Sequence, residues 1–189
     1  LAKAALLLSN STAPRFIVPQ QVLLTLPGAP VSYWLDHQCF QLLASGNRIE
    51  KFAQVVPGLK TGNDSRFLRF HWEVSDSKWV PYSKGGGGYA KWYGQTEFCV
   101  DWRHEKAPYR QYKDSRQPYS WLYRTAGFTF SAASKGALGV RALSPGSIFG
   151  AKGPGVFPID GFWVVALLNS RLCSYFVRAM AVGLDILVE

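Results

Sequence analysis

Hydrophobic and polar positions alternate in short stretches through the middle of the chain. The clearest alternation runs from Phe67 to Val74, where Arg69, His71 and Glu73 are interleaved with apolar side chains. A period of two is typical of a strand with one buried face, so this stretch predicts a half-buried strand. Short apolar runs between turn-forming residues predict further strands over residues 98–102, 127–131, 140–143 and 147–149.

Apolar runs also lie toward the two ends of the chain. Two runs separated by Pro19, at residues 16–18 and 22–24, predict short strands near the N-terminus. Ser32 is the expected N-cap of a short helix that ends at Gly46.

The most apolar segment is residues 162–182, and the run over residues 160–183 predicts a C-terminal helix. Asp160 is its expected cap and Gly183 its expected end. Asn169, Arg171 and Arg178 interrupt the apolar residues, whereas a membrane span needs roughly 20 mostly apolar residues. A core helix is therefore expected, and no membrane partner.

These elements predict a mixed α+β domain with a twisted, β-rich middle, long loops and short flanking helices. The chain has 189 residues, of which 48% are hydrophobic, and this is sufficient for one domain with a sizeable core. We expect one domain over 1–189, with N-terminal strands and a helix at 1–57, a β-rich core at 58–158 and a helix at 159–189. Because the first residue is Leu1, the chain is expected to be a fragment of a longer protein.

Positive charge is concentrated in one stretch. The formal net charge is +9 at pH 7, and residues 84–152 contain eleven Lys and Arg against four Asp and Glu. Eight Trp and Tyr residues lie between residues 92 and 123 in the same stretch. Cations with planar rings suit a polyanion such as nucleic acid. A solvated basic loop region beside an aromatic core is the alternative that composition leaves open.

Metal-binding and hydrolase signatures are absent from the sequence. The cysteines Cys39, Cys99 and Cys173 form no C-x-x-C pair, and their number is odd, which favours a reducing compartment, the cytoplasm. The three histidines are far apart and have no metal-ligand spacing. No G-x-S-x-G sequence marks a nucleophile.

Several ordered sequence blocks resemble one family of enzymes. The longest is GLKTGNDSRFLRFHWEV at residues 58–74. It resembles a segment of adenine-specific DNA methyltransferases of the BREX and phage-growth-limitation type, and more distantly of single-chain restriction-modification enzymes. Further blocks in the same order are WVPYSKGG at 79–86, KWYG at 91–94, VDW at 100–102, GFTFS at 127–131, RALSPGSIF at 141–149 and LLNS at 167–170.

In that family these blocks belong to the target recognition domain. The resemblance implies that this chain recognises specific sequences in double-stranded DNA, in phage defence or restriction-modification. Its implied partners are DNA, the catalytic domain of the same polypeptide, which uses S-adenosylmethionine, and other defence-system subunits.

The catalytic signatures of such enzymes lie outside this sequence. It has no Asn/Asp-Pro-Pro-Tyr/Phe tetrapeptide, and the glycines at 85–88 do not follow a recognisable strand or precede a helical pattern. We therefore expect this chain alone to be no enzyme and to bind no cofactor, while the parent protein is a site-specific adenine methyltransferase.

The residues expected to contact DNA follow from the resemblance and from charge. The glycine loop near Lys84 and Lys91 suits phosphate contacts, whereas Asn63 and Arg66 are residue types that read bases. A structural role for Arg66, bracing Glu73 or Asp64, is the alternative. The full set is Lys60, Thr61, Asn63, Arg66, Lys84, Lys91, Arg103, Arg124, Lys135 and Arg141.

Two other functions remain open at this stage. Seven Trp and nine Tyr with many glycines also suit a carbohydrate-binding or hydrolase-associated β module. A domain that docks a partner subunit through an aromatic surface is the third possibility. Salt dependence separates the first alternative from DNA binding, because only phosphate binding weakens steeply as salt rises.

Overall fold

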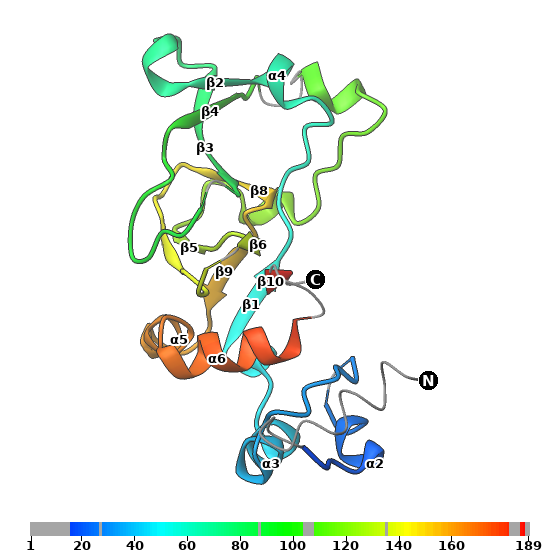
Figure 1. Ribbon diagram of the computed structural model, residues 1–189. Helices are drawn as coiled ribbons and strands as arrows, with labels where there is room; N and C mark the ends of the chain where they lie inside the picture. The colour runs from blue at the N-terminus through cyan, green and yellow to red at the C-terminus, as the bar shows by residue number, and fades with distance from the viewer. Residues whose placement is uncertain are drawn as a thin grey trace. The chain divides into compact units, whose positions relative to one another are not determined.

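The chain forms two units. The computed structural model describes residues 16–26, 28–86, 88–103, 108–134, 136–181 and 186–187. The units are Leu1–Gly46 and Asn47–Glu189. All described strands belong to the larger unit (Figure 1). The predicted mixed α+β fold with a β-rich middle is confirmed.

The described part of the smaller unit contains two short helices, α2 (Gln20–Leu23) and α3 (His37–Ser45). The strands predicted at 16–18 and 22–24 are wrong. Residues 16–19 form no regular secondary structure, and Gln20–Leu23 forms α2 instead. The N-cap of α3 is Asp36, whose carboxylate accepts a hydrogen bond from the Cys39 N–H at 2.7 Å. The predicted cap, Ser32, is fully buried instead, although the helix does end at Gly46.

The larger unit contains two four-stranded sheets, with strand orders β1-β9-β5-β7 and β2-β4-β3-β8. The first comprises β1 (Ala53–Val56), β5 (Gly127–Thr129), β7 (Arg141–Leu143) and β9 (Gly155–Pro158). The second comprises β2 (Leu68–Phe70), β3 (Trp79–Gly85), β4 (Phe98–Asp101) and β8 (Ile148–Lys152). A two-stranded pair is formed by β6 (Ala133–Ser134) and β10 (Ile186–Leu187).

Strand pairing is antiparallel except between β3 and β8, which run parallel. The consecutive strands β8 and β9 belong to different sheets, so the turn between them joins the two. The buried Thr129 hydroxyl of β5 donates to the Gly153 carbonyl in this turn at 3.0 Å. The turn is therefore fixed against the first sheet.

The hydrophobic core consists of two clusters. The first contains buried side chains of the second sheet, such as Leu68, Val80 and Phe149, together with Leu143 of the first sheet. The second packs Val164 of α5 (Trp163–Leu168) with residues of the first sheet. Figure 1 shows α5 and α6 (Arg171–Met180) at the opposite end of this unit from β2 and α4 (Asp64–Phe67).

The strand predicted over residues 67–74 is only partly formed. It is divided into the end of α4, β2 and the short 3-10 helix η2 (His71–Glu73). Two hydrogen bonds from backbone N–H groups to side chains stabilise the helices on either side of β2. Asn63 caps α4 by accepting from the Arg66 N–H at 3.1 Å, and Glu73 accepts from the Phe70 N–H at 2.8 Å.

The other predicted strands of the middle region correspond to β4, β5, β7 and β8 within one to three residues. Strands β1, β3, β6, β9 and β10 were not predicted. Pro81 lies inside β3, where it supplies no N–H for a strand ladder, and proline inside a run usually argues against a strand. The remaining 3-10 helices are η1 (Ile49–Lys51), η4 (Pro108–Gln111) and η5 (Ser120–Leu122).

The single helix predicted over 160–183 is instead two helices, α5 and α6, broken at Asn169 and Ser170. The buried Asn169 amide donates to the Val140 carbonyl and accepts from the Val140 N–H, each at 2.8 Å. Ser170 caps α6 by accepting from the Cys173 N–H at 3.0 Å. The expected end at Gly183 lies outside the described residues. No helix in the described ranges is long and apolar enough to cross a membrane.

Asn169→Ala should lower the free energy of unfolding by about 2 to 4 kcal/mol, because the buried Val140 N–H loses its acceptor and the side-chain volume is lost. Ser170→Ala is the control, since loss of the helix cap costs about 1 kcal/mol. Urea unfolding of both variants measures the difference. An equal or smaller loss for Asn169→Ala would show that the amide does not hold the helices to the sheet.

Candidate nucleic-acid interface

A depression of about 340 Å³ is lined by residues from four separate parts of the larger unit. Lys60, Lys84 and Lys152 lie around it, together with Asp64 of α4. Arg116 is adjacent, because the Lys60 and Arg116 backbones exchange two N–H···O hydrogen bonds of 2.9 Å. We call this hollow, its three lysines and the adjacent Arg116 the basic depression.

Backbone pairing brings these cations together. The Leu59 N–H donates to the Phe149 carbonyl, and the Leu59 carbonyl accepts from the Ala151 N–H, both at 2.9 Å. The buried Tyr82 hydroxyl also donates to the Leu59 carbonyl at 2.9 Å, and burial raises the pKa of this phenol. A Cβ at Gly58 would collide with the Phe149 carbonyl oxygen, so the close approach of this segment to β8 requires glycine.

Asp64 organises the depression from within. One carboxylate oxygen accepts from the Thr61 hydroxyl at 2.6 Å, and the other pairs with the Lys84 ammonium at 3.1 Å. The Asp64 and Lys84 side chains are 45% and 34% exposed, and an ion pair this exposed contributes at most about 1 kcal/mol. Asp64 therefore positions Lys84, but the ion pair is weak enough for Lys84 to exchange it for another anion.

Thr61 and Asn63 serve the turn itself. Thr61 is buried, with 1% of its surface exposed. The side-chain amide oxygen of Asn63 accepts from the Ser65 hydroxyl at 2.9 Å as well as from the Arg66 N–H. The amide group of Asn63 lies 3.5 Å from the Tyr112 hydroxyl. Both side chains hold the loop around the basic depression, and a base contact by Asn63 would compete with its capping role.

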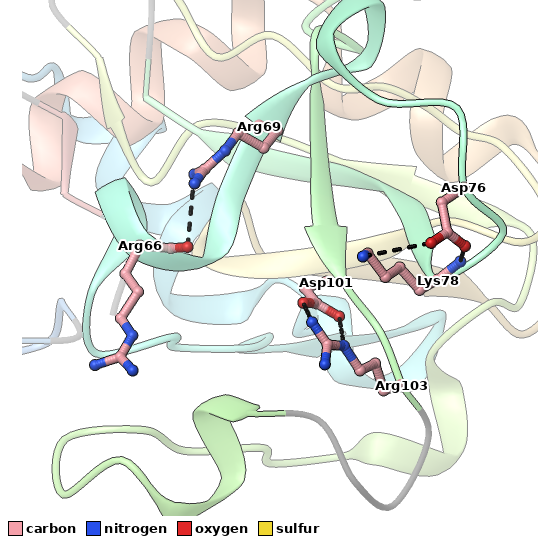
Figure 2. A network of polar contacts seen from close by, with 6 residues as sticks. All are labelled: Arg66, Arg69, Asp76, Lys78, Asp101 and Arg103. Atoms are coloured by element: carbon pink, nitrogen blue, oxygen red, sulfur yellow. Dashed lines mark hydrogen bonds and ion pairs between the residues drawn. The ribbon is translucent and has the colours of Figure 1, made fainter.

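Arg66 is an exposed cation of the predicted first turn. Figure 2 shows its exposed side chain extending away from the ion pairs around it, while its carbonyl accepts from Arg69 at 3.5 Å. The guanidinium carbon lies 5.5 Å from the centroid of the Phe67 ring. Among the described residues it forms no ion pair, so the bracing contacts with Asp64 or Glu73 are not observed.

Two cations near Arg66 are neutralised locally. Arg103 makes two hydrogen bonds to the Asp101 carboxylate, at 3.0 and 2.8 Å (Figure 2). This pair raises the pKa of the Arg103 guanidinium. Lys78 lies 3.3 Å from the Asp76 carboxylate. These pairs fix the ends of β3 and β4 and add little net charge for a partner.

Two other predicted contacts, Lys91 and Arg124, do not line the basic depression. Lys91 is half-buried, with its ammonium 5.6 Å from the centroid of the Trp92 ring. Arg124 is exposed and has a left-handed backbone, with φ of 67°. Lys135 lies outside the described residues.

Arg141 is fully buried, with 0% of its surface exposed. Burial lowers the pKa of its guanidinium to about 10, against the opposing effect of Glu97. One guanidinium nitrogen lies 3.4 Å from the Ser131 hydroxyl. Within the described ranges, its Nε and Nη2 atoms have no hydrogen-bond partner. A side chain without exposed surface does not reach a phosphate, so Arg141 is not part of the basic depression or of a DNA-binding surface.

The structure thus brings Lys60, Thr61 and Lys84 together and adds two cations that sequence analysis did not select, Arg116 and Lys152. Both belong to the basic stretch, but only strand pairing reveals that they adjoin Lys60. No group of three or more metal-binding side chains occurs among the described residues.

Comparison with known proteins gives two relatives, and no known protein-family profile matches the chain. The adenine-specific methyltransferase PglX of Lacticaseibacillus casei (strain Zhang) is 27% identical over 186 residues, covering 85% of this chain and 15% of that protein. The adenine-specific methyltransferase BrxX of Escherichia coli O9:H4 (strain HS) is 27% identical over 170 residues, covering 79% of this chain and 13% of that protein. This chain therefore spans about one seventh of the length of each relative.

Proposed function

We propose that this chain is a DNA target recognition domain of an adenine-specific methyltransferase, and that the basic depression contacts the DNA backbone. The convergence of Lys60, Lys84, Lys152 and Arg116 from separate strands and loops is the observation that carries this proposal. The similarity to a small part of two adenine-specific methyltransferases supports the wider context.

Electrostatics favours a polyanionic partner for this surface. Three lysines and one acid, Asp64, line the hollow, and Asp64 already pairs with Lys84. Arg116 adds a fourth cation beside Lys60. Mutual repulsion of the cations is relieved when phosphates lie among them, and DNA releases counterions at the same time. A neutral sugar gains nothing comparable from this charge, so the carbohydrate-binding alternative is less well supported.

Base reading is assigned to α4 in this proposal. Arg66 projects from a helix whose start is fixed by the Asn63 cap and whose end continues into β2. A guanidinium held on a fixed backbone suits bidentate contact with guanine in the major groove. The catalytic domain of the same polypeptide supplies S-adenosylmethionine and the methyl transfer, and other defence-system subunits are further partners.

Lys60→Ala and Lys152→Ala should each weaken duplex DNA binding and reduce the slope of log affinity against log salt by about one, because each removes one phosphate contact. Lys51→Ala is the matched control, since Lys51 is exposed in the same unit but lies on η1, away from the depression. Fluorescence anisotropy over a series of salt concentrations measures the slopes. The assignment fails if all three variants keep the wild-type slope.

Asp64→Asn should strengthen DNA binding, because it removes the only acid from the lining of the basic depression and releases Lys84. The amide oxygen still accepts from Thr61, so the turn is expected to persist. The salt slope should increase by up to about one. Asp160→Asn, an exposed change away from the depression, controls for net charge. An equal gain in DNA affinity in both variants would show that net charge, and not the release of Lys84, causes the change.

Arg66→Ala and Lys91→Ala should differ in the longer polypeptide that contains the catalytic domain. Loss of Arg66 should cost about 1 to 3 kcal/mol on the cognate site and relax discrimination at one base position. Loss of Lys91 should weaken binding to all sequences alike. Affinities for the cognate duplex and a panel of single-base variants decide this. Uniform loss for Arg66→Ala would exclude base reading by this residue.

A further inference from the structure

Three aromatic side chains form a stacked column beside the basic depression. The ring centroids of Trp72 and Phe70 are 4.5 Å apart with an interplanar angle of 7°. Those of Phe70 and Phe98 are 5.0 Å apart at 25°. The Lys84 ammonium lies 5.1 Å from the Phe98 centroid at the other end. We call Trp72, Phe70 and Phe98 the aromatic column.

Strand register holds the column in place. Phe70 on β2 and Phe98 on β4 are directly paired across the sheet, so their rings extend from the same face. Glu73 folds the chain back after β2 by accepting from the Phe70 N–H. This places Trp72 of η2 against the Phe70 ring. The column is therefore built on paired strands and a hydrogen-bonded turn.

The column remains exposed although its rings are large and apolar. Trp72 is 63% exposed and Phe70 is 37% exposed. Packing within the column covers Phe70 from two sides but leaves much of the indole in solvent. Clustered exposed apolar rings typically mark a surface that a partner covers.

The column adjoins the cationic surface at Lys84. Phe70, Phe98 and the exposed Glu97 line a second depression, of about 350 Å³, and Lys84 lines both this hollow and the basic depression. A partner that covers the column therefore meets an ammonium group at the end opposite Trp72. This combination fits a planar, apolar group joined to a phosphate.

We propose that the outer face of Trp72 in the aromatic column is a stacking platform for a DNA base that has left the duplex stack, while Lys84, at the other end of the column, and the basic depression hold a neighbouring phosphate of the same strand. This inference rests on the proposed function and specifies how the same surface binds distorted DNA. Bases stack on exposed aromatic side chains whatever their sequence, because every base has a π face. Lys84 then shifts from Asp64 toward phosphate, a change that the exposure of their ion pair permits.

The test uses the full 189-residue chain and two labelled DNA probes, a fully paired duplex and the same duplex with a short single-stranded gap containing 2-aminopurine. The wild type should bind the gapped probe more tightly and quench its 2-aminopurine fluorescence. Trp72→Ala should weaken binding to the gapped probe by about 5- to 150-fold and abolish quenching. Its salt slope should stay unchanged.

Two further variants make this result specific. Trp72→Phe retains an aromatic face and should keep most of the preference for the gapped probe. Trp121→Ala removes a similarly exposed indole, 70% exposed on η5, and should bind like wild type. If Trp72→Ala does not fold, as judged by circular dichroism, Trp72→Leu replaces it and should show the same loss.

The remaining outcomes overturn the inference in distinguishable ways. Wild-type affinity and quenching in folded Trp72→Ala or Trp72→Leu would exclude stacking, while the Lys60→Ala salt effect would leave the proposed function intact. Absence of DNA binding by the wild type at low salt would contradict both the stacking inference and the proposed function. Salt-independent binding of a neutral oligosaccharide, lost in Trp72→Ala, would assign the column to sugars instead.

Discussion

The pairing of Leu59 with β8 is the constraint on which the site depends. Leu59 is completely buried, and its backbone N–H and carbonyl are both bonded to β8. Because this short segment is held on β8, the exposed Lys60 that follows it lies beside Lys152 and Lys84. The glycine at position 58 permits the approach. Hydrogen bonds of neutral backbone groups thus hold like charges close together, and their repulsion is available to favour an anionic partner.

Cations in this protein serve different purposes according to their surroundings. Arg103 is neutralised by a nearly buried carboxylate, that of Asp101, and Arg141 is enclosed entirely. Net charge alone does not separate these from Lys60 or Arg66, which remain available to a partner. Exposure and local pairing therefore define the proposed interface more narrowly than the +9 of the whole chain.

Sequence analysis predicted the fold class and most strands of the middle region, because turn residues punctuate short apolar runs there. It missed β3, which contains Pro81, and it predicted one strand where Asn63 and Glu73 redirect the backbone. Local periodicity does not report such side-chain-to-backbone bonds. Lys60 and Lys84 were selected from the family resemblance. Their proximity to Lys152 depends on long-range pairing, which no local pattern contains.

Protection of lysines from acetylation shows directly whether the basic depression contacts DNA. The chain is acetylated with and without a saturating DNA duplex at low salt, and modification at each lysine is quantified by mass spectrometry. Our account predicts strong protection of Lys60 and Lys152, with Lys51 modified equally in both states. Equal modification of Lys60 and Lys152 with and without bound DNA, or protection confined to Lys51, would contradict it.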